Sequence, residues 1–256
     1  MHSPDELKAL VDESLERLDL WPELHGQSTS VRYALEVGGK RVRPVIALAV
    51  GEALGAPVEK VMPAALAIEL IHTFSLVHDD LPAMDDDEER RGHPSTWKKF
   101  GEGVGVLAGD ALLGEAFRLA ARYESSSVAR ELAEATLGMI GGQYLDTMVE
   151  GYDLAAVHRL KTGRLFYAAV TLALWAVELP LEEQEPWRAF AEELGLLFQI
   201  VDDILDADGY VREHGADEAR RLADEAAERA RGRLAEVDAD TSVLRDIVDG
   251  LAVRTA

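Results

Sequence analysis

The sequence contains no cysteine, and this absence narrows its chemistry. Without a thiol, a disulfide framework, a thiolate metal site and a cysteine nucleophile are all excluded. Any metal ion must then be held by oxygen or imidazole ligands. A run of about eighteen apolar residues is also missing, and the start lacks a basic region followed by an apolar one. We therefore expect a soluble, untargeted, cytoplasmic protein with no stable membrane insertion.

Positive charge is scarce, because 26 lysine and arginine residues stand against 48 aspartate and glutamate residues. The formal net charge of −22 repels nucleic acid and anionic membranes, so we expect neither as a partner. Solubility is the simplest explanation of the bulk charge. An anionic substrate needs a local reversal of this field, so the positions of the basic residues are informative.

Aromatic residues make up only 6% of the chain, and the alternation of β-branched residues that marks strands is absent. Apolar residues recur at helical spacing instead, so we predict an all-α fold, a single domain over residues 1–256 and no strand. Two helices, near 62–80 and 188–206, are apolar on most of their surface, which places them inside a bundle. Helices are predicted at residues 5–19, 28–37, 41–54, 58–81, 93–100, 103–122, 125–149, 153–179, 183–207, 214–236 and 240–253.

Both of these core helices end in clustered aspartates, and the first cluster contains Asp79, Asp80, Asp85 and Asp86. In an unbroken helix Asp79 and Asp85 would lie about 240° apart and could not share an ion. Pro82 disfavours continued helix and lets the chain turn back. Asp85 or Asp86 can then return to the face of Asp79.

The second cluster places Asp202 and Asp206 four residues apart, so both carboxylates project to one side of the helix. Two unpaired carboxylates there would repel each other, and a shared cation removes the repulsion. Oxygen ligands favour magnesium or calcium, and magnesium usually binds through one or two carboxylates together with substrate phosphates. A solvated helix end explains either cluster alone, but two clusters on core helices favour a metal and diphosphate site.

The basic residues gather in the turn Gly38–Pro44, the pair Arg90 and Arg91, and the segment Lys161–Gly163. The first of these leads into a predicted helix, where backbone amides with Lys40 and Arg43 can cradle a phosphate group. A capping loop is an equal alternative for this turn. All three segments supply positive charge in a chain that has little of it.

The acidic and basic segments, with others between them, resemble the trans-isoprenyl diphosphate synthases of the polyprenyl synthetase family, farnesyl and geranylgeranyl type. The resemblance covers about residues 31–207, in the family's order. It implies a single-domain, isoprenoid synthase-type helical bundle around a central cavity, and a homodimer formed through core helices. The matching segments are Gly39–Pro44, Glu69–His72, Asp79–Asp85, Arg90–Gly92, Ala108–Leu112, Gly141–Gln143, Leu160–Gly163 and Phe198–Asp206.

The resemblance implies a prenyltransferase that condenses isopentenyl diphosphate with an allylic diphosphate: dimethylallyl, geranyl or farnesyl diphosphate. It implies up to three magnesium ions, bound with diphosphate by Asp79, Asp85 and Asp202 and supported by Asp206, Asp80 and Asp86. It assigns isopentenyl diphosphate to Gly39, Lys40, Arg43, His72 and Arg91, and the allylic diphosphate to Arg90 and Lys161. Thr162 and Gln199 would steady the cation that forms. For Gln143, an interhelical hydrogen bond and a site role are equal alternatives.

Product length in this family depends on side chains beneath the first aspartate motif, here Phe74 and Ser75. Phe74 lies about 7.5 Å down the helix from Asp79 and can form the floor of the hydrocarbon pocket. We therefore predict farnesyl diphosphate, with geranylgeranyl diphosphate as the alternative because Ser75 is small. A class I terpene cyclase and a non-catalytic subunit of a heteromeric prenyl synthase are alternatives of other classes.

The sequence departs from the family after Asp206, where the family continues with a glycine-rich loop that carries a third lysine. Here residues 207–215 run directly into a predicted helix, and no lysine follows Lys161. Arg212 either replaces the missing contact or is a solvated surface residue. A shorter lid leaves the cation more exposed to water, so a slow enzyme, a different acceptor and a partner-supplied lid stay open.

Overall fold

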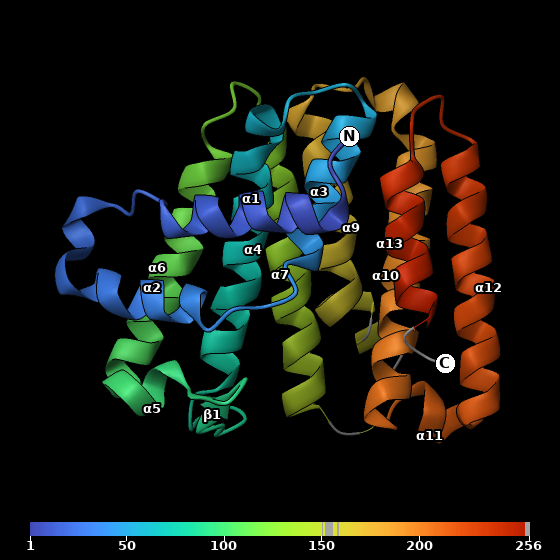
Figure 1. Ribbon diagram of the computed structural model, residues 1–256. Coiled ribbons are helices and arrows are strands. Elements are labelled where there is room, and N and C mark those ends of the chain that lie inside the picture. The colour runs from blue at the N-terminus through green and yellow to red at the C-terminus, as the bar shows by residue number, and fades with distance from the viewer. Residues whose placement is uncertain (150, 152–155, 158, 254–256) are drawn as a thin grey trace.

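The computed structural model describes residues 1–149, 151, 156–157 and 159–253, and it is a bundle of helices (Figure 1). The predicted all-α fold is confirmed. The α-helices are α1 Pro4–Glu16, α2 Ser28–Glu36, α3 Val42–Ala53, α4 Val58–Asp79, α5 Thr96–Phe100, α6 Glu102–Ala120, α7 Ser127–Met148, α9 Arg164–Ala176, α10 Glu185–Asp206, α11 Tyr210–His214, α12 Ala216–Ala235 and α13 Ser242–Val253. Short helices of other types are η1 Pro22–Gln27, η2 Arg159–Gly163 and η3 Leu181–Glu183, and the strands are β1 Glu89–Arg90 and β2 His93–Pro94.

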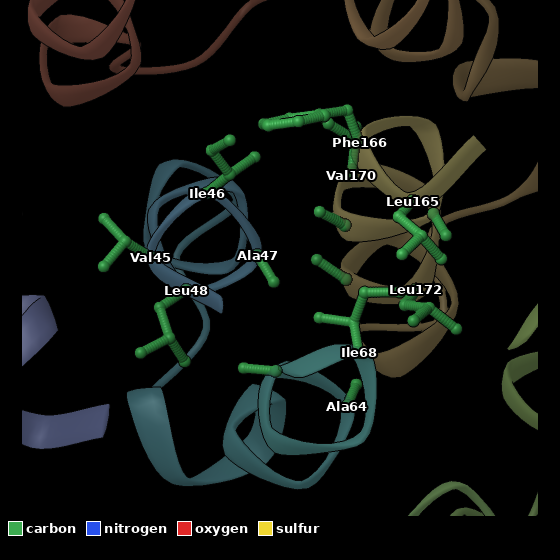
Figure 2. Packing of buried hydrophobic residues seen from close by; sticks show 14 of the residues in the cluster. Val45, Ile46, Ala47, Leu48, Ala64, Ile68, Leu165, Phe166, Val170 and Leu172 are labelled. Atoms are coloured by element: carbon green, nitrogen blue, oxygen red, sulfur yellow. The ribbon is translucent and has the colours of Figure 1, made fainter. Parts of the chain in front are cut away.

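Helix α4 lies inside the bundle, as its apolar surface predicts. It packs against α3, α6 and α9, and Figure 2 shows Ile68 and Ala64 of α4 beside side chains of α3 and α9. By length and composition α4 could cross a membrane, but 67% of its apolar window is buried in the protein. The second core helix, α10, packs against α9 and the alanine-rich α12. These contacts carry both aspartate clusters toward the same end of the bundle.

Several predicted boundaries were wrong. Residues 89–94 form a hairpin, because Arg91 and Gly92 adopt positive φ angles of 55° and 77°. The helix predicted at 93–100 therefore begins only at Thr96. Such a pair of residues is typical of a tight two-residue hairpin turn. The helix predicted at 214–236 is interrupted at Gly215, and the first part of the one predicted at 153–179 lies outside the described residues.

Tyr123 repairs a break in the hydrogen bonding of α4, which contains Pro63. The Ala64 N–H donates to the tyrosine oxygen at 3.1 Å, and the tyrosine hydroxyl donates to the Lys60 carbonyl at 2.8 Å. In a regular helix this N–H would bond the Lys60 carbonyl directly. The hydroxyl thus satisfies both backbone groups, and burial raises the pKa of Tyr123 to about 12.

We expect Tyr123→Phe to lower the free energy of unfolding by about 1–3 kcal/mol, because it leaves a donor and an acceptor without a partner. Urea unfolding measures this loss. Because the pKa lies above its ordinary value of 10, the tyrosine's contribution is complete below pH 10 and is lost as the pH rises through about 12. The matched control is Tyr144→Phe, at an exposed position, with an expected change within about 0.5 kcal/mol. Equal losses in the two variants would contradict this role.

Candidate active site

A cavity of about 1120 Å³ lies between α4, α6, α7, α10, η2 and the loop before α3. It brings together most of the residues that the sequence singled out, from five separate segments. The predicted residues that line it are Gly39, Lys40, Arg43, His72, Phe74, Ser75, Asp79, Arg90, Arg91, Lys161, Thr162 and Asp202. The remaining predicted site residues, Asp80, Asp85, Asp86, Gln199 and Asp206, are not among its lining residues.

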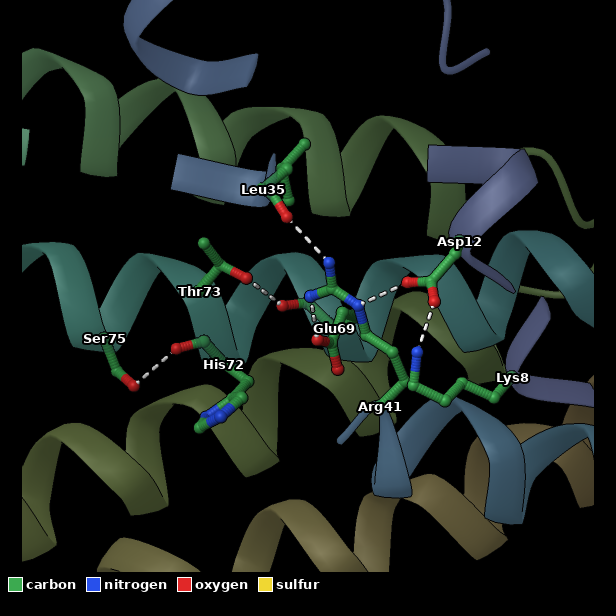
Figure 3. Close-up of polar contacts among 8 residues, drawn as sticks. All are labelled: Lys8, Asp12, Leu35, Arg41, Glu69, His72, Thr73 and Ser75. Atoms are coloured by element: carbon green, nitrogen blue, oxygen red, sulfur yellow. Dashed lines mark hydrogen bonds and ion pairs between the residues drawn. The ribbon is translucent and has the colours of Figure 1, made fainter. Parts of the chain in front are cut away.

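Arg41, for which no separate role was predicted, anchors the basic turn. Its guanidinium donates to Glu69 at 2.7 Å, to Asp12 at 2.9 Å and to the Leu35 carbonyl at 2.6 Å (Figure 3). Arg41 and Glu69 are both buried, and Arg41 has a positive φ of 50°. A buried arginine with three acceptors is held in one geometry. It therefore fixes the backbone on either side, which carries Lys40 and Arg43.

The pocket beyond this anchor is electropositive. Desolvation lowers the pKa of Arg43 to about 10, against the opposing effects of Glu69 and Asp202. Its guanidinium lies 4.4 Å from the centre of the Phe166 ring, and its buried Nε has no partner among the described residues. Burial, and then Arg43 and Arg91, lower the pKa of His72 well below 6.5, so His72 is neutral at pH 7. Arg43 is charged at that pH, so this wall of the cavity attracts an anion.

The first acidic cluster folds back as the sequence predicted. Helix α4 ends at Asp79, and the Asp85 N–H donates to the Asp79 carbonyl at 2.9 Å. Burial raises the pKa of Asp79 to about 6, with Lys161 opposing the rise and Asp85 adding to it. The indole of Trp97 donates to the Asp87 carbonyl at 2.9 Å and ties the acidic loop to α5.

Asp80, predicted as a supporting magnesium ligand, is paired with Arg90 and is not among the lining residues. Its buried carboxylate accepts Arg90 Nε at 2.7 Å, with a second contact at 2.5 Å from Nη2. The Asp80 side chain is 4% exposed, whereas Arg90 also lines the cavity. Asp80 is therefore placed to orient Arg90, because a two-pronged contact fixes the plane of the guanidinium. Of these two adjacent aspartates, Asp79 lines the cavity and Asp80 holds Arg90.

In the second cluster, Asp202 lines the cavity, and burial, then Asp206 and Asp203, raise its pKa. Asp203, which the sequence did not single out, is buried and accepts the Gln199 side-chain amide at 2.6 Å and the Tyr210 N–H at 2.8 Å. This bond turns Gln199 toward Asp203 and away from the position expected of it. The sequence alone does not distinguish Asp203 from Asp202 and Asp206. Its backbone partner, Tyr210, lies beyond the end of α10, and the helical pattern does not predict this contact.

Lys161 and Thr162 lie on the π-helix η2, where the sequence predicted regular helix. A Cβ added to Gly142 of α7 would lie 2.4 Å from the Lys161 nitrogen, so only glycine allows this close approach. Short π-helical turns frequently occur at functional sites. The Lys161 ammonium contacts Asp146 at 2.6 Å. Gln143 lines the cavity with both amide atoms buried and without a partner in the described ranges, which favours a site role.

The donor set suits a hard divalent cation. Asp79 and Asp202 have raised pKa values because they are desolvated and lie near other carboxylates, so each lacks sufficient positive charge. Among the residues that the structure describes, no three acidic or histidine side chains converge as a ready ligand set. This arrangement fits magnesium, which takes few protein ligands and completes its shell with water and substrate phosphates.

Comparison with known proteins decides the family. The family model named Polyprenyl synthetase matches residues 27–219, which include both acidic clusters and all the lining residues. The chain belongs to the polyprenyl synthetase family. The resemblance inferred from the sequence is confirmed.

Relatives within the polyprenyl synthetase family carry two product names. The chain is 42% identical over 209 residues to the farnesyl diphosphate synthase of Bacillus subtilis, covering 76% of this chain and 70% of that protein. It is 46% identical over 205 residues to a heterodimeric geranylgeranyl pyrophosphate synthase large subunit 1 of Arabidopsis thaliana, covering 73% of this chain. That match spans 55% of the plant protein, so the chain covers about half of its length.

Two solved structures share this polyprenyl synthetase fold. A geranyltransferase from Legionella pneumophila superposes with a TM-score of 0.88 at 28% identity, covering 98% of this chain and 96% of that one. A FPP/GFPP synthase from Zymomonas mobilis gives a TM-score of 0.86 at 30% identity and covers 97% of both chains. The isoprenoid synthase-type fold is therefore shown over nearly the whole chain.

The segment after Asp206 is compact. Arg212 pairs with Asp208 at 2.9 Å, and its side chain is 73% exposed. It is not among the residues that line the cavity. This placement agrees with the interpretation of Arg212 as a solvated surface residue, and it gives no replacement for the third lysine.

Proposed function

We propose that this chain is a short-chain trans-prenyl diphosphate synthase. It condenses isopentenyl diphosphate with an allylic diphosphate, and farnesyl diphosphate is the product. One observation carries the proposal: a single cavity is lined by one group of cations around Arg43, near Asp202, and by another in which Lys161 and Arg90 act on Asp79. Two anion sites in one cavity match a reaction that joins two diphosphates.

Magnesium would be held by Asp79, Asp85 and Asp202, supported by Asp206 and Asp86, and it supplies Lewis-acid neutralisation of the diphosphate. Lys161 and Arg90 hold the allylic diphosphate and stabilise the negative charge that develops as its C–O bond breaks. The electron pair stays on the departing pyrophosphate. The alkene of isopentenyl diphosphate attacks the allylic cation to form the new C–C bond, and the proton lost goes to pyrophosphate.

The second diphosphate lies against the other wall. Arg43, Arg91 and Lys40 contribute charge there, and the neutral imidazole of His72 donates a hydrogen bond without adding charge. The apolar lining of the cavity excludes water, which would otherwise trap the cation. The Thr162 hydroxyl lies on the cavity wall, where its dipole can face the cation.

The reaction is tested by incubating the purified chain with magnesium, isopentenyl diphosphate and each allylic primer, followed by product identification. A linear prenyl diphosphate is expected. A cyclic hydrocarbon would favour the terpene cyclase, and activity only after a partner is added would favour the non-catalytic subunit.

Phe74 is 7% exposed and lines the cavity, so it supports farnesyl diphosphate over geranylgeranyl diphosphate. We expect Phe74→Ala to shift the main product from C15 to C20 or longer, because it opens the floor of the pocket. Chromatography at limiting enzyme measures the ratio of C20 to C15 product. This ratio should rise by about tenfold or more, which corresponds to about 1.4 kcal/mol. Thr171→Ala, at a buried position on α9 outside the lining, is the control. Unchanged chain length in Phe74→Ala would show that Phe74 does not limit the length of the product.

We also propose a cytoplasmic homodimer. The support is exposed apolar side chains on α6 and α7, where Leu107 and Leu137 are 56% and 68% exposed. Exposed apolar patches of this kind favour association. Light scattering after size exclusion measures the mass, and a monomer at micromolar concentration would contradict the proposal.

A further inference from the structure

The segment Ala108–Leu112 matches the family, yet no step of the proposed reaction uses it. Gly109 in this segment faces α4 and lies directly against His78. A Cβ built on Gly109 would lie 2.1 Å from His78 Nε2 and 2.2 Å from its Cδ2. Since the clash is with the ring itself, any larger residue at this position must displace the histidine.

The His78 ring is also fixed by α6 in a second way. Its Nε2 lies 2.9 Å from the Val106 carbonyl, which can only accept, so Nε2 carries the proton in this bond. The ring is thus flanked by Gly109 and bonded through Nε2 to Val106. The ring belongs to α4 but is held by α6.

His78 in turn contacts Phe74, which is proposed above to form the floor of the hydrocarbon pocket. Phe74 lies four residues earlier on the same face of α4, and the two rings meet edge to face with centres 4.9 Å apart and planes at 73°. Both side chains line the cavity, as does Val106. His78 is thus next in sequence to Asp79, a proposed metal ligand, and lies one helical turn from Phe74.

We propose that His78 is a positioning residue for product length: held by Gly109 and Val106, its ring keeps the Phe74 ring at the end of the hydrocarbon pocket. This inference rests on the proposed function. Without the His78 ring, Phe74 can turn toward the vacated space, and the pocket accepts a longer chain. The glycine of Ala108–Leu112 is then needed to make room for the histidine.

The test compares His78→Ala, Gly109→Ala and the double variant by their ratio of C20 to C15 products. Each single variant is expected to raise the ratio by roughly 2- to 10-fold, the factor that corresponds to one edge-to-face ring contact. Gly114→Ala is the control, because it lies on the same helix with nothing within 4 Å of an added Cβ. It should leave the ratio unchanged.

The double variant distinguishes the positioning of Phe74 by His78 from a general loss of packing. If Gly109→Ala acts only by displacing the ring, it adds no further change to the ratio once His78 is alanine. Equal effects of Gly109→Ala with and without the histidine, or a wild-type ratio in His78→Ala, would overturn the inference.

Calorimetric binding of farnesyl and geranylgeranyl diphosphate provides a second readout. Both single variants should bind the longer molecule roughly 2- to 10-fold more tightly relative to the shorter one. This measurement reports pocket depth even if the wild type forms no product, an outcome that would count against the proposed function alone. If the relative affinities of the variants for the two diphosphates equal those of the wild type, the inference about His78 is overturned. Thermal melting confirms that each variant is folded.

Discussion

Asp79→Asn is expected to reduce kcat by about 10²- to 10³-fold while making the metal-free protein more stable. The loss of activity follows because the amide removes one charged ligand from the proposed magnesium site. The gain in stability follows because burial raises the pKa of Asp79 from 3.8 to about 6. At pH 7 the folded, metal-free protein therefore contains an ionised carboxylate that is largely removed from water, which is unfavourable.

The sign of the stability change follows from the difference between the pKa of Asp79 in the folded state and in the unfolded state. A raised pKa in the folded state contributes stability below pH 3.8, and this contribution is lost as the pH rises through about 6. At pH 7 the asparagine variant avoids the loss, so its free energy of unfolding should increase by about 1–3 kcal/mol. Denaturant unfolding without metal and steady-state kinetics with magnesium measure the two effects separately.

Magnesium affinity should also depend on pH. Protonated Asp79 cannot bind the ion, so the affinity should fall as the pH drops below about 6 and level off above it. Glu89→Gln, in the same acidic segment and exposed, is the control and should alter activity by no more than about 2-fold. An Asp79→Asn variant that is both active and less stable would contradict the assignment.

Glu69→Ala is expected to have the largest effect on stability, a loss of about 3–5 kcal/mol in the free energy of unfolding. The side chains of Glu69 and Arg41 are 4% and 5% exposed and form a 2.7 Å ion pair. Removing the carboxylate leaves the Arg41 charge buried. It also removes the negative charge that offsets Arg43 and Arg91, since Glu69 acts on both of their pKa values.

Glu69→Gln removes the negative charge but keeps the size of the side chain, so it separates the effect of the charge from the effect of packing. Inorganic pyrophosphate should stabilise this variant more than it stabilises the wild type, because the anion supplies the missing negative charge in the basic pocket. The shift in melting temperature with added pyrophosphate measures this difference. Asp12→Asn removes the more exposed partner of Arg41, 34% exposed, and should cost no more than about 1 kcal/mol. If the Glu69 variants lose no more than Asp12→Asn, the buried pair is not the anchor.

Local sequence determined the features that depend on near neighbours. The helical spacing of apolar residues predicted the all-α fold, and the apolar surface of α4 predicted its buried position. Pro82 predicted that the chain turns back so that Asp85 approaches Asp79. Each of these follows from residues within a few positions of one another, and local conformational preferences act over that range.

Tertiary structure decided which of the clustered side chains line the cavity. Asp79 and Asp80 are adjacent in sequence, yet only contact with Arg90 shows that Asp80 holds an arginine. Gln199 is drawn to Asp203, and His78 depends on Gly109 of another helix. The sequence by itself determined the helices, the acidic clusters and the family resemblance. Which side chains pair across the bundle was decided only by the packing of helices, because partners distant in the chain leave no periodic signal in either segment.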